Sequence, residues 1–183
     1  MDAKQETVRA MKLRDCEPSD IPAVAAIYGR EVENGTASFE LTPPGEAEML
    51  ARRAALVAGR YPYLVAEIDE AVAGYAYAGP YRARPAYLST LENSVYVDPR
   101  FRGRGVARRL LAALVEAGAA RGFRQMIAVI GDSANAGSIG VHLKTGFTLI
   151  GTHPSVGLKF GRWLDTVMMQ RALGEAATTV PGD

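Results

Sequence analysis

Cysteine, histidine and tryptophan are scarce in this chain of 183 residues, which contains one Cys, two His and one Trp. The single Cys16 cannot form an internal disulfide, and together with His142 and His153 it is too little to build a Cys/His zinc site. We therefore expect a protein without a metal. A chain without a disulfide framework is typical of a reducing compartment, so we expect it in the cytoplasm.

An excess of charge of one sign is also missing, because 21 Lys and Arg residues stand against 20 Asp and Glu residues. The formal charge of +1 gives no overall attraction to nucleic acid or to an anionic membrane. No apolar run is long enough to cross a bilayer, and residues 1–15 mix charges without the apolar stretch of a signal peptide. We expect neither a nucleic acid nor a membrane among the partners.

The composition that remains is that of one globular domain. Apolar residues make up 48% of the chain and charged residues 22%, which suffices for a sizeable core at this length. We expect this domain to span residues 8–173. The two ends, 1–7 and 174–183, are polar and without pattern, so we expect both to be flexible.

Hydrophobic periodicity and capping residues predict the order β, α, α, β, β, β, α, β, α, β, β. The fourth helix has Asp132 or Ser133 as its expected N-cap. The order indicates a mixed α/β domain. We expect strands at 8–14, 63–68, 72–78, 88–97, 125–130, 147–153 and 164–173, and helices at 17–32, 46–59, 106–122 and 134–145.

The predicted strand that ends at Val97 carries an unusual mixture of side chains. Alternation divides its residues between two faces of the sheet. One face receives Thr90, Glu92, Ser94 and Tyr96, and the other receives Leu91, Asn93, Val95 and Val97. The first face therefore presents one carboxylate among hydroxyl groups.

A glycine-rich basic turn connects this strand to the third helix. Gly103 and Gly105 allow close approach of a ligand to the backbone, and the free N–H groups at the start of a helix favour an anion. A P-loop would require Gly-Lys-Ser/Thr, and a dinucleotide-binding turn would require glycine in place of Arg108. An ordinary turn at a helix start, with a solvated basic rim, remains an alternative. Clustered arginines also bind nucleic acid, but the balanced total charge favours a local phosphate site; they are Arg100, Arg102, Arg104, Arg108 and Arg109.

A polar stripe marks the fourth predicted helix, where Asn135, Ser138 and His142 follow one another at spacings of three and four. One interpretation is a ligand-facing stripe. The other is a solvent-facing stripe that begins with a capping asparagine and includes a structural histidine.

The segment from Arg102 to Ala107 matches the R/Q-x-x-G-x-G/A turn of GNAT-type N-acetyltransferases. Five further segments strengthen the match: TASF, RARPAY, TLENSVYV, NAGSIGVHLKTGF and VGLKFGRWLD. Together they make the chain, over about 11–173, resemble the phosphinothricin/methionine sulfoximine N-acetyltransferase branch of this family.

This resemblance implies a GNAT fold, in which helices flank a mixed, mostly antiparallel central sheet, and it implies a homodimer. It also implies transfer of acetyl from acetyl-CoA to the α-amino group of a small amino-acid-like acceptor, by direct attack in a ternary complex. Acetyl-CoA would be bound by Val95, Tyr96, Val97, Arg102, Gly103, Arg104, Gly105, Val106, Ala107, Asn135 and Ser138.

Two residues are the expected catalytic groups. Glu92 is the candidate base, because a partly buried carboxylate beside Tyr96 can have a raised pKa; a purely structural carboxylate is the alternative. His142 stands where the family usually has tyrosine, and it can act as a proton relay or acid near the thiolate, as a second base, or as a structural group.

A loop rich in arginine is expected to bind the acceptor. Arg82 and Arg84 can pair with its carboxylate and its phosphinate or sulfone oxygens, unless they are solvated loop charges. Phe39 and Tyr87 would form apolar walls, or else belong to the core. Thr90 and Glu92 complete the expected acceptor site together with Lys159, which, like Trp163, could instead serve a dimer interface.

Two other functions remain compatible with these residues. One is acetyl transfer to a different amine, such as a polyamine, an antibiotic or a protein N-terminus. The other is a non-catalytic CoA-binding sensor, which would not need the carboxylate of Glu92.

Overall fold

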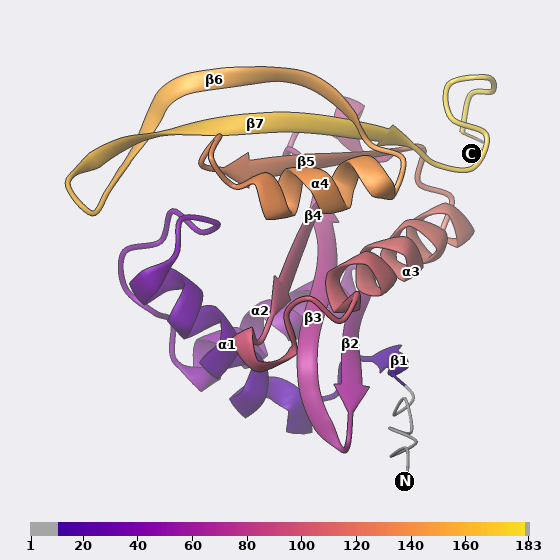
Figure 1. Cartoon of the computed structure of the whole chain (residues 1–183). Helices are drawn as coiled ribbons and strands as arrows, with labels where there is room; N and C mark the ends of the chain where they lie inside the picture. Colours follow the sequence, from indigo (N-terminus) through magenta and orange to yellow (C-terminus); the bar gives the residue numbers. More distant parts are fainter. Residues whose placement is uncertain (1–10, 182–183) are drawn as a thin grey trace, which may run out of the picture.

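The structure, a computed structural model, describes residues 11–181 (Figure 1). The expected flexible segment 1–7 and the first residues of the strand expected at 8–14 lie outside the described residues, as do 182 and 183. None of the helices within 11–181 is long and apolar enough to cross a membrane. The elements are β1 (Lys12–Asp15), α1 (Ile21–Asn34), α2 (Glu46–Ala58), β2 (Tyr63–Ile68), β3 (Ala71–Pro80), β4 (Thr90–Val97), α3 (Val106–Ala120), β5 (Gln125–Gly131), α4 (Ala136–Lys144), β6 (Thr148–Lys159) and β7 (Arg162–Ala172), with short 3-10 turns at Pro18–Asp20, Pro85–Tyr87 and Pro99–Phe101.

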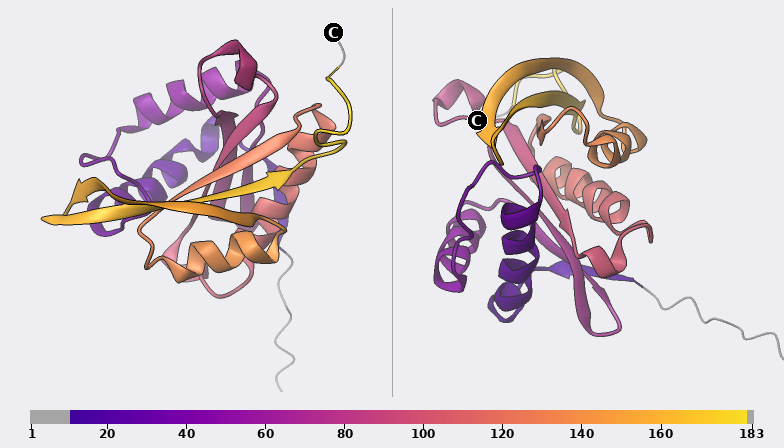
Figure 2. Two further views of the ribbon diagram at one scale, coloured as in Figure 1. Left: turned by 90° about the horizontal axis from the view of Figure 1, so that it is seen from above. Right: turned by 60° about the vertical axis from the view of Figure 1, so that its left-hand side comes forward.

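The strands form one sheet in the order β1-β2-β3-β4-β5-β7-β6. Neighbouring strands are antiparallel except for β4 and β5, which are parallel. The sequence-based prediction of a mixed, mostly antiparallel sheet flanked by helices is therefore confirmed. Helices α1 and α2 lie on one face of the β2–β4 part of the sheet and α3 lies on the other (Figure 2).

Strand alternation builds a separate core on each face. On the α1 side, Tyr63 and Val65 of β2 pack with apolar residues of α1 and with Met49 of α2. On the α3 side, Leu64 packs against a row of leucines that includes Leu110, which is fully buried. Burying such a leucine contributes about 1.5–3 kcal/mol, so the two cores hold the sheet firmly between the helices.

The C-terminal hairpin is longer than the sequence predicts. Strand β6 continues to Lys159, beyond the expected end at residue 153, and a turn at Phe160 and Gly161 leads directly into β7. The sequence of β6 does not alternate regularly between buried apolar and exposed polar residues, because some of its apolar residues, such as Leu149 and Val156, are exposed. The pattern therefore does not reveal the full length of the strand. Figure 1 shows this hairpin extending well past the remainder of the sheet.

The start of α4 also differs from the prediction. Asn135, rather than Asp132 or Ser133, is the N-cap, and its Oδ1 accepts a hydrogen bond from the Ser138 N–H at 3.1 Å. The carboxylate of Asp132 instead accepts from the Ala134 N–H and from Arg162. Asp132 has a positive φ of 70°, so the chain turns there before the helix begins.

Strands β4 and β5 diverge in the middle of the sheet. They pair only from Thr90 opposite Gln125 to Asn93 opposite Ala128. Beyond these residues β4 stays paired with β3 and β5 stays paired with β7. A gap therefore opens between the carboxyl-terminal halves of the two parallel strands.

Candidate active site

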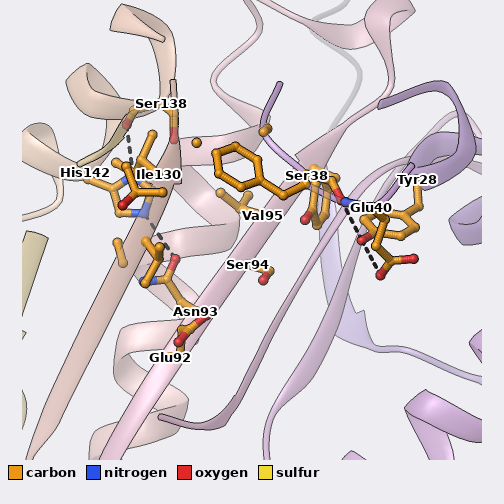
Figure 3. Close-up of a pocket in the computed structure, with 17 residues that line it drawn as sticks. Tyr28, Ser38, Glu40, Glu92, Asn93, Ser94, Val95, Ile130, Ser138 and His142 are labelled. Atoms are coloured by element: carbon orange, nitrogen blue, oxygen red, sulfur yellow. Dashed lines mark hydrogen bonds between the residues drawn. The ribbon is translucent and has the colours of Figure 1, made fainter. Parts of the chain in front are cut away.

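A cavity of about 420 Å³ occupies the gap between the diverging strands (Figure 3). Its walls come from β4, β5, α1, α4, β7 and the loop that follows α1. The lining residues are Tyr28, Ala37, Ser38, Phe39, Glu40, Glu92, Asn93, Ser94, Val95, Tyr96, Ala128, Val129, Ile130, Gly131, Ser138, His142 and Thr166.

Glu92 brings an unpaired carboxylate to this cavity. Within residues 11–181 no hydrogen-bond or ion-pair partner holds it, in contrast to Glu40 on the opposite wall. Burial raises the pKa of Glu92, and the positive charge of Arg82 opposes that rise in part. A carboxylate with a raised pKa accepts a proton more readily than an ordinary one.

Glu40 is a carboxylate of the opposite kind. Its Oε1 accepts hydrogen bonds from the Tyr28 hydroxyl at 2.8 Å and from Arg52 at 2.7 Å. Burial disfavours its charged form, but Arg52 and Tyr28 outweigh that effect and lower the pKa of Glu40. It is therefore a fixed negative charge rather than a base.

His142 is buried between α4 and β4. Its Nδ1 lies 2.8 Å from the Ser138 carbonyl oxygen, and its Nε2 lies 3.1 Å from Oδ1 of Asn93, whose Nδ2 donates to the Ile127 carbonyl. Both ring nitrogens thus face protein oxygens. Burial lowers the pKa of His142, and the hydrogen bond to Ser138 works in the other direction.

Asn93 is a pocket residue that the sequence analysis did not select. The available signal was its polarity, because it interrupts the apolar face formed by Leu91, Val95 and Val97. In the structure it joins β4 to β5 and to α4 at the point where the strands part. The hydroxyl-bearing Ser38 and Tyr28 were missed as well: Ser38 lies in the TASF segment, from which only Phe39 was selected, and nothing in the local sequence marks Tyr28.

Lys159 holds the loop that follows α1. It is only 3% exposed, and its Nζ donates to the carbonyl oxygens of Gly35 and Ser38 at 2.9 and 2.7 Å. Burial lowers the pKa of Lys159. The ammonium group therefore faces the backbone of this loop and does not line the cavity.

The same loop carries Phe39 into the cavity wall. Its ring rests against two glycines, Gly131 of β5 and Gly157 of β6, where an added Cβ would overlap the ring. Since only glycine leaves room for the ring, Gly131 and Gly157 allow Phe39 to pack directly against the backbone of the two strands.

The glycine-rich turn lies at the start of α3. Gly103 and Gly105 both have φ of +78°, and an added Cβ at either position would meet open space. Gly105 is the N-cap and supplies no side chain to the first N–H groups of α3. An anion such as a pyrophosphate fits there, because these N–H groups and the helix dipole point at it and Arg102 and Arg104 are exposed beside it.

The predicted site residues fall into two groups. Phe39, Glu92, Val95, Tyr96, Ser138 and His142 line one cavity. The others lie elsewhere: Arg82, Arg84 and Tyr87 in the exposed β3–β4 loop, Thr90 and Val97 at the two ends of β4, Asn135 at the cap of α4, Lys159 under the loop, and Arg102, Gly103, Arg104, Gly105, Val106 and Ala107 at the start of α3. Within 11–181 no cluster of three or more Cys, His, Asp or Glu is suited to a metal ion.

Comparisons with known proteins give one consistent answer. Residues 12–147 match the acetyltransferase (GNAT) family. The chain is 49% identical to a phosphinothricin N-acetyltransferase of Alcaligenes faecalis, across 94% of this chain and 87% of that protein. It is 44% identical to an L-methionine sulfoximine/L-methionine sulfone acetyltransferase of Pseudomonas paraeruginosa, across 86% of this chain and 92% of that protein.

The solved structures agree. The structure of a GNAT superfamily phosphinothricin acetyltransferase from Sinorhizobium meliloti, in complex with AcCoA, has a TM-score of 0.92 and 46% identity, with 94% of each chain covered. The GNAT fold and the resemblance to phosphinothricin and methionine sulfoximine acetyltransferases are thereby confirmed. The chain is a member of the acetyltransferase (GNAT) family.

Proposed function

We propose that this protein transfers acetyl from acetyl-CoA to the α-amino group of phosphinothricin, methionine sulfoximine, methionine sulfone or a similar small amino acid. The transfer is direct, in a ternary complex. The observation that carries this proposal is the unpaired carboxylate of Glu92, with its raised pKa, in the cavity between β4 and β5. Relatives named for these acceptors, at 49% and 44% identity, support the acceptor class.

Acetyl-CoA, when bound, supplies the acetyl group as a thioester. The N–H groups of the Arg102–Ala107 turn would hold its pyrophosphate. Val95, Tyr96 and Val97 follow the point where β4 loses its partner β5, so their backbone can pair with an extended ligand arm as a strand does. Asn135 and Ser138 at the start of α4 would flank that arm.

Glu92 acts as the general base. An α-amino group must lose its proton to become a nucleophile, and Glu92 can accept that proton directly or through one water. The two carboxylates of the cavity therefore have different roles. Glu40, whose pKa is lowered, stays charged and acts electrostatically, whereas Glu92, whose pKa is raised, accepts the proton.

His142 has two connected roles in this proposal. Its ring ties Asn93 and α4 to β4 through its two hydrogen bonds. As a proton donor to the departing thiolate it would have to carry its proton on Nε2, the ring nitrogen that lies 3.1 Å from Oδ1 of Asn93. Proton donation by His142 therefore requires Asn93 to turn aside.

The β3–β4 loop and the loop after α1 bind the acceptor from two sides. Arg82 and Arg84 pair with its oxyanions, and Arg82 is close enough to Glu92 to affect the pKa of that carboxyl. Phe39 and Tyr87 form apolar walls, and Thr90 offers a hydroxyl at the start of β4. Lys159 contributes by ordering the Phe39 loop.

Replacing Arg82 by glutamine should move the acidic limb of the pH profile of kcat/KM to higher pH. The positive charge of Arg82 favours the ionised form of Glu92, so its loss raises the pKa of Glu92 further and a higher pH is needed to ionise the base. The shift should shrink at high salt, since Arg82 is solvent-exposed. An Arg82→Lys variant keeps the charge and should keep the limb in place. An unmoved limb in Arg82→Gln would show that the charge of Arg82 does not influence the base.

Replacing Gly157 by alanine should raise the acceptor KM by about tenfold, or about 1.4 kcal/mol, because the new Cβ overlaps the ring of Phe39 and displaces the loop. The KM for acetyl-CoA should change little. Gly151→Ala, on the same strand, adds its Cβ to open space and is the matched control. Equal acceptor KM values in the two variants would exclude Phe39 from the acceptor wall.

We also propose that the protein is a homodimer that works in the cytoplasm, where the acetyl-CoA pool is available. Support for the dimer comes from the long β6–β7 hairpin, which leaves six large apolar side chains more than half exposed, and self-association can cover apolar surface of this kind. These side chains are Leu149, Ile150, Val156, Leu158, Phe160 and Trp163. Sedimentation velocity measures the dimer directly.

The test of function is release of free CoA thiol from acetyl-CoA in the presence of purified protein. The acceptor panel contains phosphinothricin, methionine sulfoximine, methionine sulfone, spermidine and a short peptide. We expect turnover with the first three and background rates with the last two. Turnover confined to spermidine or the peptide would overturn the acceptor class, and binding of acetyl-CoA without turnover would favour a sensor.

A further inference from the structure

A second cavity, of about 400 Å³, lies between α2 and the sheet, outside the proposed acceptor site. We propose that this tyrosine cavity is a binding site for a neutral, planar aromatic molecule. Its lining residues are Tyr28, Met49, Arg52, Ala55, Leu56, Tyr61, Tyr63, Tyr75, Tyr77 and Pro80.

The cavity lies along the side of α2 that faces the sheet. Met49 is the only residue of α2 that is buried, Leu56 packs at the edge of the α1-side core, and Arg52 and Ala55 are exposed at the border of the cavity. The space opens to solvent between Arg52, Ala55 and Pro80, and its volume of about 400 Å³ falls in the range of ligand pockets.

Aromatic rings form the floor of the cavity. Tyr63 and Tyr77 have centroids 5.2 Å apart, and Tyr75 stands 5.9 Å from Tyr63 and 6.4 Å from Tyr77. The interplanar angles of 12–32° make the three rings nearly parallel. A further planar ring gains offset-stacked contact with such a row, which a non-planar molecule of the same volume cannot make.

The polar groups of the cavity select a neutral ligand. The hydroxyl of Tyr75 is, among the side-chain atoms of 11–181, the buried one without a hydrogen-bond partner, but Tyr75 is 0% exposed, so this hydroxyl is closed off from the cavity and gives a ligand no hydrogen bond. At the rim, Arg52 is already paired with Glu40 and Glu48, so a negatively charged ligand finds no free cation there.

Tyr28 separates this cavity from the acceptor site. It lines both cavities, its ring meets Tyr96 edge-on at 5.1 Å, and its hydroxyl bonds to Ser38 and Glu40, which line the acceptor side. A ligand in the tyrosine cavity therefore lies behind the wall of the acceptor site. Its binding should persist when CoA and an acceptor occupy that site.

The experiment is a fluorine NMR titration of the full-length protein with 5-fluoroindole, in the presence of CoA and methionine sulfone. We expect saturable binding with a Kd of about 1 mM or lower, which is within reach of a ligand of this size. Ala55→Trp fills the mouth of the cavity from an exposed helix position and should weaken binding by about tenfold or more. Ala54→Trp, on the neighbouring exposed position outside the lining, should bind as the wild type does.

Two further measurements guard against the possibility that a tryptophan variant loses binding because it misfolds. Saturation of tyrosine ring protons in the wild-type protein should transfer to 5-fluoroindole, and indole-3-carboxylate should not compete with it. CoA release by both tryptophan variants should equal that of the wild type. The proposal is overturned by absence of saturable binding, by equal binding to the two variants, or by competition from the carboxylate.

Discussion

Replacing Glu92 by glutamine is expected to lower kcat for acetyl transfer by about 10²–10⁴-fold, the contribution typical of a positioned general base. The amide is nearly isosteric with the carboxylate but cannot accept the proton of the acceptor amine. The initial rate of CoA release at saturating acetyl-CoA and acceptor gives kcat directly. The acidic limb of the wild-type pH profile should also vanish, because the group responsible for it is gone.

Glu40→Gln provides the comparison for this experiment. It removes a second carboxylate from the same cavity, but one whose pKa is lowered by Arg52 and Tyr28 despite its burial. We expect its effect to fall on the acceptor KM and to leave the acidic limb in place. Equal losses of kcat in both variants would show that the cavity needs negative charge and not a base at Glu92.

Replacing Gly105 by alanine is expected to raise the KM for acetyl-CoA by about 10–100-fold, or about 1.4–2.7 kcal/mol. The added methyl group occupies the open space in which we propose that the pyrophosphate approaches the backbone. The acceptor KM should stay close to that of the wild type. Initial rates over a range of acetyl-CoA concentrations measure the effect.

Gly122→Ala is the matched control at the other end of the same helix. Gly122 has φ of +86°, close to the +78° of Gly105, and its Cβ would also meet open space. Each substitution adds about 1–2 kcal/mol of left-handed strain, so both variants should lose similar thermal stability. Only Gly105→Ala should lose affinity for acetyl-CoA. An equal rise in the KM for acetyl-CoA in Gly122→Ala would show that backbone strain alone explains the effect.

The local sequence pattern predicted those structural features that depend on a single segment of the chain. Alternation in β4 correctly separated the face of Glu92 from the face of Leu91, because a strand with two different cores on its two faces has a period of two. Glycine at 103 and 105 correctly marked a turn before α3, and both residues have positive φ in the structure. Periodicity and capping residues predicted the order of the elements, and the family resemblance added the GNAT fold.

Partners distant in sequence could not be predicted in this way. The hydrogen bond between His142 and Asn93 joins residues 49 positions apart, and that between Lys159 and the Gly35 carbonyl joins residues 124 apart. Periodicity indicates that a residue is buried but not which oxygen it meets. For this reason Lys159 was expected at the acceptor, whereas its ammonium group in the structure serves the backbone of the Phe39 loop.

The early end of β4–β5 pairing also has a consequence for amide hydrogen exchange. Beyond Asn93, β4 is in the middle of the sheet by position but is bonded only to β3, so its amides that face the gap are open to solvent like those of an edge strand. Amide exchange along β4 should therefore be slow up to Asn93, and beyond Asn93 it should be fast at every second residue. A ligand that pairs with this strand would slow the fast amides, which makes exchange at Val95 to Val97 a direct report of occupancy in the absence of turnover.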